Sequence, residues 1–312
     1  MRLSKGSEGP SLLYKYREDS PRTEEILTTQ KIWLSTAEYL NDPLECRTGQ
    51  IPEGWKRKRI REMEDAQMAG FIMSALPALK EKQPFYSLSH RAARRWFQRL
   101  KLLKTRKEKY ATIRSFLKEH GSNISRPAEL FDTFERQLAD VGIFSLSACP
   151  DNQLMWAHYA ASHTGLALGF KRTPTSKLGS NEHVLKVVYD NSKPTFNSGF
   201  INKVSMFATP RGGIKSEQKV GFSDPTFRAA FSTKPVAWSY EEEWRYVEEK
   251  SGLFPWPGPV ERVVFGLKMP NNRRKHYGSL VSKVVNGLVE FYTITMAGDN
   301  ASFEMIPWSA RP

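Results

Sequence analysis

Hydrophobic and polar residues alternate in several short stretches of the chain, and this alternation predicts strands. The stretches are 12–16, 32–35, 143–147, 165–170, 184–189, 233–247, 260–267 and 288–295. A helix is predicted over 21–29, with Ser20 as N-cap and Pro21 at the first helical position. A short helix is predicted over 152–161, and 196–220 has no sharp period and is interpreted as a segment that can include a mobile loop. Together these elements predict an α+β fold with a predominantly antiparallel or split sheet, not alternating βαβ units.

A different pattern fills residues 51–140, which are mostly charged and helix-forming, with one interruption near Gln83 and Pro84. Within 80–118 the apolar residues recur at steps of three, four or seven, which predicts helix. They are Trp96, Phe97, Leu100, Leu103, Tyr110, Ile113 and Leu117. We interpret residues 1–312 as a single domain with a helical, basic insertion at 51–140.

Positive charge is concentrated in that insertion. The chain of 312 residues has 47 Lys and Arg against 33 Asp and Glu, a formal charge of +14. Thirteen Lys and Arg against two acidic residues in 80–118 give +11 of this excess. Like charges on neighbouring helical turns repel each other, so the imbalance indicates a polyanionic partner. The alternative is a solvated helix whose Lys and Arg stems cover apolar neighbours.

A nucleic acid is therefore the predicted partner of the basic helices. The residues predicted to bind it are Arg91, Arg94, Arg95, Arg99, Lys101, Lys104, Arg106, Lys107 and Lys109.

Compartment and membrane attachment are predicted from what the sequence does not contain. It has no run of about 18 to 20 apolar residues, so we expect no membrane span. Residues 1–10 are polar and lack the apolar core of a secretory signal. Cys46 and Cys149 have no CxxC partners, which excludes a disulfide framework and a Cys-rich metal site. We therefore expect a cytoplasmic protein.

The stretch 238–247 carries the most suggestive chemistry. Interpreted as a strand, it presents Trp238, Tyr240, Glu242 and Trp244 on one face, and Ser239, Glu241, Glu243 and Arg245 on the other. Two carboxylates on one face suit stabilisation of a developing cation or activation of a nucleophile, so Glu241 and Glu243 are the candidate catalytic residues. The alternative is an exposed ladder in which Glu243 or Glu241 pairs with Arg245.

A second candidate site lies on the first predicted strand. Lys15 and Arg17 alternate there with Tyr14 and Tyr16, so the cations could hold phosphates while the rings stack on a base. The alternative is an edge strand with a snorkelling lysine and a half-buried tyrosine pair.

Other catalytic classes lack their usual signals. There is no GxxxxGK[ST], GxGxxG or GxSxG motif, which are the marks of P-loop NTPases, dinucleotide-binding units and serine hydrolases. His158 and His163 are five residues apart, a poor spacing for two metal ligands on one helix, so no metal site is predicted. A hydrogen-bonded structural role is the favoured interpretation of His158.

Several motifs, taken in order, resemble a bacterial and phage family catalogued as a domain of unknown function. They are LYKYR at 13–17, WLS at 33–35, NDP at 41–43, SLS at 145–147, DNxLMWxHYA at 151–160, HTG at 163–165, GF at 169–170, WxxExEWR at 238–245 and VFG at 264–266. The resemblance spans 11–45 and 142–268 and leaves the basic helices outside.

The first strand and helix also resemble those of the ADP-ribosyltransferase superfamily. This resemblance implies an ADP-ribosyltransferase-like fold, with a split mixed or antiparallel sheet, and NAD as the substrate. Lys15 or Arg17 would then occupy the family's first-strand Arg or His position, and Ser35 its second-strand position. Glu241 and Glu243 would form the doubled glutamate of the late strand.

The resemblance also implies roles for these residues. Glu243 would bind the nicotinamide-ribose hydroxyl and stabilise the transition state, and Glu241 would orient the acceptor. A first-strand tyrosine would stack on nicotinamide, and a first-strand cation would contact the pyrophosphate. The other members of the predicted NAD site are Asn41, Asp42, Trp156, His158 and Tyr159.

We therefore expect an NAD-dependent ADP-ribosyltransferase-like enzyme that modifies a nucleic acid or a nucleic-acid-associated target, an activity that would suit a toxin or a phage-defence factor. The alternative is a non-catalytic nucleic-acid-binding module on the same fold, in which the glutamate pair is a structural ladder. A third interpretation is a nuclease that uses the carboxylates with Mg²⁺, although no clustered Asp, Glu and His motif supports it.

Overall fold

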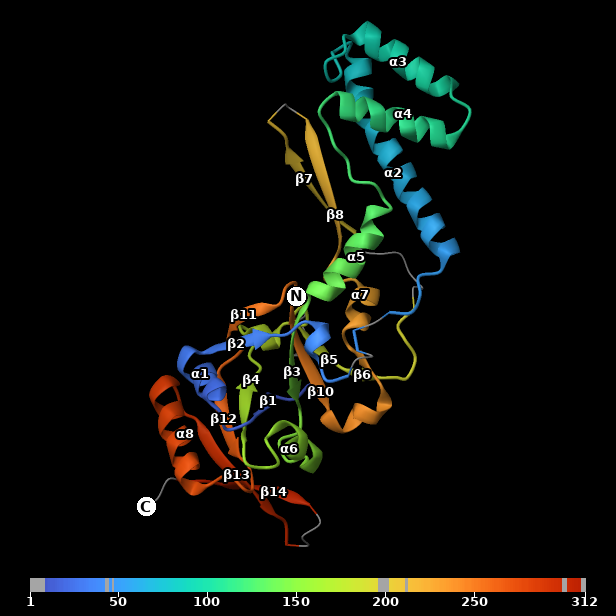
Figure 1. Ribbon diagram of the computed structural model, residues 1–312. Coiled ribbons are helices and arrows are strands. Elements are labelled where there is room, and N and C mark those ends of the chain that lie inside the picture. Colours follow the sequence, from blue (N-terminus) through green and yellow to red (C-terminus); the bar gives the residue numbers. More distant parts are fainter. Residues whose placement is uncertain are drawn as a thin grey trace, which may run out of the picture. The chain divides into compact units, whose positions relative to one another are not determined.

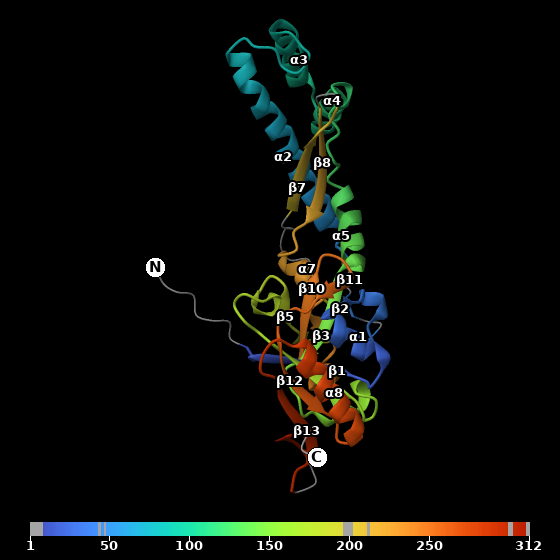
Figure 2. The same cartoon turned by 90° about the vertical axis from the view of Figure 1, so that its left-hand side faces the viewer.

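The computed structural model describes residues 9–42, 45–46, 48–195, 202–210, 213–298 and 302–309. By its internal contacts the chain divides into two compact units (Figures 1 and 2). The first, here called the pocket unit, contains Met1–Arg47, Leu138–Pro194 and Arg228–Pro312. The second, here called the helical unit, contains Thr48–Gln137 and Thr195–Phe227.

The described part of the pocket unit is built around an eight-stranded mixed sheet in the order β14-β13-β12-β4-β1-β3-β10-β5. Its strands are β1 (Leu12–Arg17), β3 (Gly142–Ser147), β4 (Leu166–Lys171), β5 (Val184–Lys186), β10 (Glu243–Glu248), β12 (Val260–Phe265), β13 (Glu290–Met296) and β14 (Phe303–Pro307). Neighbouring strands are antiparallel except β12 and β13, which are parallel. The fold is thus α+β with a mostly antiparallel sheet, as predicted.

Shorter elements complete the unit. Two two-stranded sheets pair β2 (Lys31–Leu34) with β11 (Gly252–Pro255) and β6 (Val188–Tyr189) with β9 (Thr233–Lys234). The helices are α1 (Pro21–Thr29), α6 (Gln153–Tyr159) and α8 (Asn271–Val284), with short 3₁₀-helices at η1 (Ala37–Tyr39), η2 (Lys177–Gly179) and η3 (Val236–Glu241).

Helices cover both faces of the central strands. Leu13 of β1 packs in one core with Leu27 of α1 and Val281 of α8, and Figures 1 and 2 show these two helices side by side. Tyr14 and Tyr16 point to the opposite face, where they pack against α6. This alternation follows from the two-residue period of a strand.

The sheet opens between β1 and β3. β1 pairs with β4 along its whole length but meets β3 through the pair Tyr14 and Ser147. Beyond that pair the strands diverge, and the ammonium of Lys15 reaches across the gap to the Ser145 carbonyl at 3.0 Å. The gap leaves room for a pocket in the middle of the sheet.

The predicted strand over 233–247 is wrong in its middle. β9 ends at Lys234, η3 follows, and β10 begins only at Glu243. Pro235 accepts a hydrogen bond from the Trp238 amide, which closes a 3₁₀ turn, and Glu242 takes a left-handed conformation with φ of 45°. The two-face assignment of residues 238–242 therefore fails, because this segment is not extended.

The helical unit contains most of the stretch predicted to be helical. Its elements are α2 (Glu53–Lys80), α3 (His90–Leu102), α4 (Arg106–Glu119), α5 (Glu129–Asp140), β7 (Asn202–Ala208), β8 (Ile214–Val220) and α7 (Pro225–Ala230), of which α5 and α7 continue into the pocket unit. A second break, absent from the prediction, separates α3 from α4, because Thr105 and Glu108 form a capping box that starts a new helix. No helix among the described residues is long and apolar enough to cross a bilayer.

The stretch 196–220, interpreted as a segment that can include a mobile loop, contains two strands that the prediction lacked, because β7 and β8 pair there as a hairpin. Residues 196–201 and 211–212 lie outside the described part of the chain. The alternation of β8 is hidden because its buried positions include the polar Ser216 and Gln218. Both side chains hydrogen-bond to Ser125, so polar residues are satisfied where a strand pattern would place apolar ones.

Candidate functional site

A pocket of about 730 Å³ opens where β1 and β3 diverge. It is lined by β1, α1, the outer face of β2, η1, β3, α6, Lys234 of β9, and the junction of η3 with β10. Most residues predicted for the site lie on it: Tyr14, Lys15, Tyr16, Arg17, Ser35, Asn41, His158, Tyr159, Glu241 and Glu243. Segments distant in sequence are thus brought together at one place.

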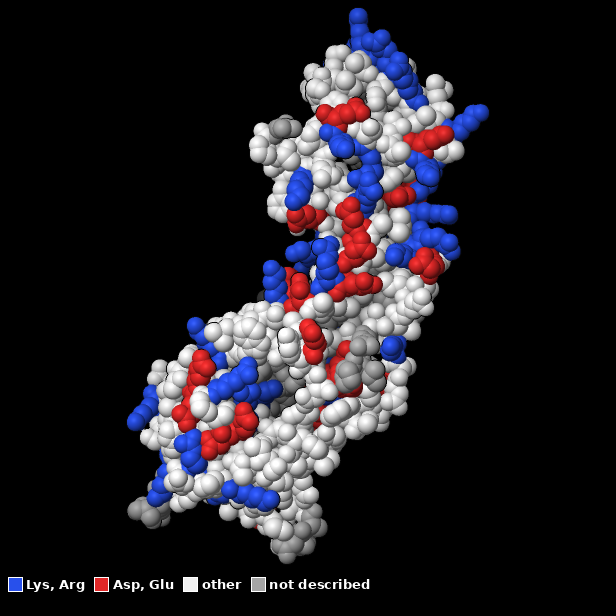
Figure 3. Space-filling view, in the orientation of Figure 1, with Lys and Arg blue, Asp and Glu red and all other residues white. Residues whose placement is uncertain are grey.

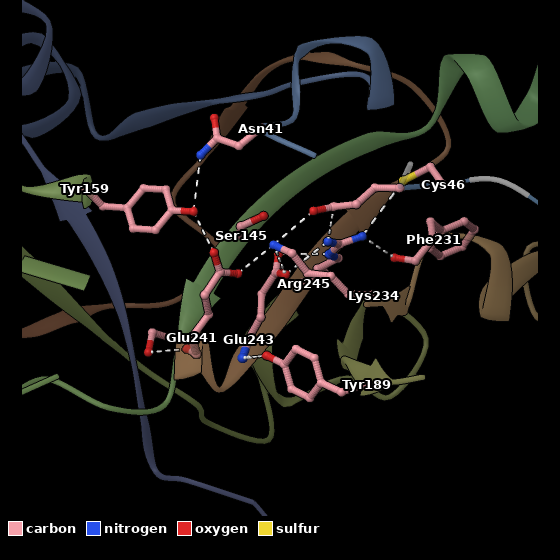
Figure 4. Close-up of polar contacts among 12 residues, drawn as sticks. Asn41, Cys46, Ser145, Tyr159, Tyr189, Phe231, Lys234, Glu241, Glu243 and Arg245 are labelled. Carbon is pink, nitrogen blue, oxygen red and sulfur yellow. Dashed lines mark hydrogen bonds and ion pairs between the residues drawn. The ribbon is translucent and has the colours of Figure 1, made fainter. Parts of the chain in front are cut away.

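Three carboxylates and two cations form the floor of the pocket (Figure 4). Glu241 and Glu243 are each 3% exposed and Glu45 is 5% exposed. Between them lie Lys234, 4% exposed, and Arg245, which is fully buried. Charged groups at this depth require partners, because burying an unpaired charge costs several kcal/mol or more.

Lys234 bridges all three carboxylates. Its ammonium lies 2.6 Å from Glu241 Oε2, 2.9 Å from Glu45 Oε1 and 3.2 Å from Glu243 Oε2. It also lies 4.8 Å from the centre of the Trp238 ring. Its carboxylate neighbours outweigh the cost of burial and raise the pKa of Lys234, so the side chain stays charged.

Arg245 clamps Glu243. Its Nε donates to Glu243 Oε1 at 2.8 Å and one terminal nitrogen donates to Oε2 at 3.0 Å. The same guanidinium pairs with Glu45 and donates to the Phe231 carbonyl at 2.9 Å. The pairing of Glu243 with Arg245, which the ladder interpretation predicted, is present, but it is buried rather than exposed.

The two candidate catalytic carboxylates differ in their environments. Burial acts on Glu243, but Arg245 and Lys234 outweigh it and lower its pKa to about 2. For Glu241 burial is the stronger influence and raises its pKa, although Lys234 and Tyr159 oppose it. Glu243 is therefore held as a fixed anion, whereas the raised pKa of Glu241 makes it the stronger base of the two. Paired carboxylates with pKa values pushed apart are typical of catalytic sites.

A short hydrogen-bonded chain connects Glu241 to η1. The Tyr159 hydroxyl donates to Glu241 Oε1 at 2.5 Å and accepts from the Asn41 amide at 3.2 Å (Figure 4). Both residues were predicted to belong to the site. Asn152, the N-cap of α6, also donates to the Tyr240 carbonyl at 3.0 Å, which ties this helix to η3 beside Glu241.

The first strand presents its cations to the pocket. Burial, with the repulsion of Arg17, lowers the pKa of Lys15 to about 8, so this ammonium is protonated at neutral pH and loses its proton just above it. The buried Nε of Arg17 has no hydrogen-bond partner among the described residues. Arg22 and Lys31 line the same pocket. The pocket thus combines an acidic, ion-paired floor with cations on β1, α1 and β2.

Four predicted NAD-site residues have other roles. Trp156 is fully buried, donates from Nε1 to the Pro150 carbonyl at 2.9 Å and packs edge-on against Tyr16. Tyr14 and Tyr16 are each 4% exposed with their rings in the core on the α6 face, so neither ring is placed to stack on a ligand. Asp42 is buried and does not line the pocket. Both tyrosines belong to the pocket lining, but alternation turns their rings to the face of β1 opposite Lys15 and Arg17, where they pack in the core.

His158 and Ser35 lie on the pocket in different ways. The His158 side chain is exposed, with its ring 6.3 Å from that of Tyr240, and its hydrogen-bonded structural role stays a prediction. Ser35 continues β2 and exchanges two backbone hydrogen bonds with Ile143 of β3, at 3.0 and 2.8 Å. These bonds hold the two-stranded sheet of β2 and β11, here called the β2 ribbon, against the pocket.

Sequence reasoning missed Lys234 and Glu45. Neither lies in a recognisable local pattern. Glu45 acts through partners far along the chain, whereas Lys234 is seven residues from Glu241 and is brought to it by the turn at η3. Glu45 follows the NDP motif by two residues, which is the one signal that could have indicated it.

Among the described residues, no group of three or more His, Cys, Asp and Glu is arranged to hold a metal ion. Here the space between the three carboxylates is filled by Lys234 and Arg245.

The basic residues of the helical unit divide by position. Lys and Arg side chains gather along α3 (Figure 3). Its exposed face carries Arg91, Arg94, Arg95, Arg99 and Lys101, while Lys104 and Lys107 are exposed nearby and Lys109 is half-buried. Arg106 differs from the prediction, because it binds Glu64 at 2.7 Å and Asp65 at 2.6 Å on α2. Its charge is thus neutralised within the unit.

Comparison with known proteins adds a partial match. No curated protein and no solved structure matches the chain. Residues 155–246 match the model of a family described as a protein of unknown function, DUF2971. The matched segment contains Tyr159, Lys234, Glu241, Glu243 and Arg245, so it covers much of the pocket floor. The chain therefore resembles, over this segment, a family whose function is unknown.

Proposed function

We propose that the pocket binds NAD and transfers its ADP-ribosyl group to an acceptor. The observation that carries this proposal is the pair of buried carboxylates on the pocket floor, whose pKa values are displaced in opposite directions. The resemblance of the first strand, the second strand and the Glu-x-Glu segment to ADP-ribosyltransferases supports it. Because the same segments line one pocket, the resemblance and the geometry select the same residues.

The pocket has the charges that NAD requires. Lys15 and Arg17 provide cations for the diphosphate, and the unpaired Nε of Arg17 is a donor that a phosphate oxygen would satisfy. The anionic floor suits the positive charge that develops on the ribose as nicotinamide leaves. The volume of about 730 Å³ lies within the usual range for ligand pockets.

In the proposed reaction, the bond between ribose C1′ and the nicotinamide nitrogen breaks, and its electron pair leaves with nicotinamide. An acceptor oxygen or nitrogen forms the new bond to C1′, and its proton passes to a Glu241 carboxylate oxygen. Glu241 is assigned this role because burial raises its pKa, which makes it the stronger base. Glu243, clamped by Arg245, acts as a fixed negative charge. This division keeps Glu243 at the developing cation and Glu241 at the acceptor, as the family resemblance implied, and adds proton transfer to the role of Glu241.

Incubation of the full chain with NAD tests the proposal. We expect release of nicotinamide together with transfer of label from adenylate-labelled NAD to a nucleic acid or protein of a cell lysate. Chromatography measures nicotinamide, and gel autoradiography identifies the labelled class. An absence of nicotinamide release across lysates and nucleic acids, with NAD failing to bind, would overturn the transferase and favour the non-catalytic binding module.

The proposed partner of the helical unit is a nucleic acid. Support comes from the exposed face of α3, where five basic side chains lie without an acidic residue in the helix. Such a face binds phosphates with release of counterions and little sequence preference. Binding through α3 would raise the local concentration of an acceptor for the pocket.

Substitution of a single α3 arginine should weaken nucleic-acid binding in a salt-dependent way. We expect Arg95→Gln to reduce the slope of log affinity against log salt by about 1, because one phosphate contact is lost. Fluorescence anisotropy with a labelled 20-nucleotide strand measures this slope. Lys275→Gln, which removes an equally exposed charge from α8 of the pocket unit, is the matched control and should leave the slope unchanged. Equal effects of the two variants would mean that net charge, not α3, drives binding.

A further inference from the structure

The outer face of the β2 ribbon exposes an aromatic side chain at the pocket. Along β2, Ile32 and Leu34 point into the core, whereas Lys31 and Trp33 point outward. Trp33 is 51% exposed although it is the largest side chain of the strand. An exposed indole lining a pocket indicates a binding surface more strongly than a scattered apolar residue does.

Other apolar groups share this side of the pocket. Leu253 of β11 pairs with Trp33 across the ribbon and is 60% exposed. Tyr39 of η1 is 76% exposed, and all three side chains belong to the pocket lining. None of these rings or chains is needed by the ion-paired floor, so the proposed NAD chemistry leaves them without a role.

The charges near these groups favour a phosphate-bearing ligand. Lys31 projects from β2 on the same face as Trp33, and Arg22 lines the pocket from the first turn of α1. Two carboxylates, Glu18 and Glu25, also line the pocket here, so the rim is mixed rather than strongly basic. Flat aromatic surfaces combined with Lys and Arg are the usual means of binding unpaired nucleobases and their phosphates.

The position of Tyr39 connects this surface to the reacting residues. Tyr39 lies two residues before Asn41, whose amide donates to Tyr159, and Tyr159 donates to Glu241. An acceptor that stacks on Trp33 and Tyr39 would thus approach the pocket from the side of Glu241, the proposed general base. A paired base could not stack there, because its faces are covered within a duplex.

We propose that Trp33 and Tyr39 form the acceptor subsite, on which an unpaired base of a single-stranded nucleic acid stacks while Lys31 and Arg22 bind its phosphates. This inference rests on the proposed transferase function and names the class of its acceptor. It assigns the ribbon formed by β2 and β11 to substrate selection rather than to NAD binding.

The test compares two labelled probes, a ten-nucleotide single-stranded RNA and an abasic ribose-phosphate strand of the same length and charge. Because both contact the basic α3 face equally, the ratio of their affinities reports base stacking alone. We expect the RNA to bind at least about tenfold more tightly, and Trp33→Ala to remove most of that ratio. Trp33→Phe should retain it, because phenylalanine keeps a stacking face. Leu288→Ala, which truncates a 90% exposed leucine of the same unit, is the control and should not change the ratio.

The outcomes separate this proposal from the transferase itself. Equal affinity for the two probes, or a ratio that survives Trp33→Ala in a variant with an unchanged circular dichroism spectrum, overturns the stacking platform. Label transfer only to proteins, lost in Trp33→Ala, would make the ribbon a protein-acceptor surface and also overturn it. A base-dependent ratio that falls in Trp33→Ala, in a chain that never releases nicotinamide, would support the platform while the transferase fails.

Discussion

Replacement of Glu241 by Gln is expected to lower the rate of nicotinamide release by at least about 100-fold while the chain stays folded. The substitution keeps the shape of the side chain and removes its charge and its ability to take a proton. General base catalysis by a positioned carboxylate contributes about 10² to 10⁴ in rate, which sets the expected loss. Lys234 retains Glu45 and Glu243 at 2.9 and 3.2 Å, so its charge stays compensated in the variant.

The pH dependence of turnover provides a second readout of the same residue. Glu241 acts as a base when deprotonated, and burial raises its pKa above the ordinary value of 4.5. Turnover should therefore rise with pH through a midpoint above 4.5, and this acidic limb should be absent from the residual rate of Glu241→Gln. Stopped assays of nicotinamide between pH 4 and 8 measure it.

A matched control is Glu261→Gln, which alters a partly exposed glutamate paired with Lys171 on the same sheet. It should leave both the rate and the pH profile unchanged. A Glu241→Gln variant with wild-type turnover would contradict the proposed role, and the fixed anion Glu243 would become the residue to test next.

The sequence predicts those parts of the fold in which local pattern and tertiary environment agree. β1, β3 and β4 alternate or are continuously apolar because they cross the core, and α1 has its cap and first-turn proline in place. Where polar residues face inward, as Ser216 does in β8, the pattern disappears and the strand is missed. At η3 the propensities favour a strand, and the turn is set instead by Pro235 and by the left-handed conformation of Glu242.

The candidate site could be predicted in part for a related reason. Glu241, Glu243 and Arg245 are close in sequence, so their proximity in space follows from the chain itself. Lys234 is only seven residues from Glu241, but a continuous strand would place the two on opposite faces, and the turn at η3 brings them together. Glu45 pairs with this cluster from far along the chain, and such long-range pairing leaves no periodic trace. The orientation of Lys15 and Arg17 toward the pocket required knowing where β1 separates from β3, which only the strand register establishes.

The largest effect on stability is expected at the clamp between Arg245 and Glu243. Arg245→Met should reduce the free energy of unfolding of the pocket unit by about 3–5 kcal/mol, the usual cost of removing one partner from a buried ion pair. Its guanidinium compensates Glu243 and Glu45 and also satisfies the Phe231 carbonyl. Removal therefore leaves three carboxylates sharing Lys234 alone.

Urea unfolding followed by tryptophan fluorescence measures this loss, since six of the eight tryptophans lie in the pocket unit. Lys171→Gln is the control, because Lys171 pairs with Glu261 at the surface, where such a pair contributes about 0–1 kcal/mol. Similar losses in both variants would contradict the assignment of the floor as a buried, mutually dependent network.

The stability of the pocket unit should fall at acid pH, because Glu243 in the same network becomes protonated there. The pKa of Glu243 is lowered from 4.5 to about 2 in the folded chain, so this group stabilises the fold fully above pH 4.5. That stabilisation is lost as pH falls from 4.5 to about 2, where the folded carboxylate finally takes up a proton. Glu241 has the opposite effect on stability, because its raised pKa makes it take up a proton at a higher pH in the folded chain than in the unfolded chain.

In Arg245→Met the clamp that lowers the pKa of Glu243 is gone, so stability should fall less steeply between pH 4.5 and 2 than in the wild type. A wild-type slope in that variant would mean that other carboxylates, not Glu243, determine the acid sensitivity of the pocket unit.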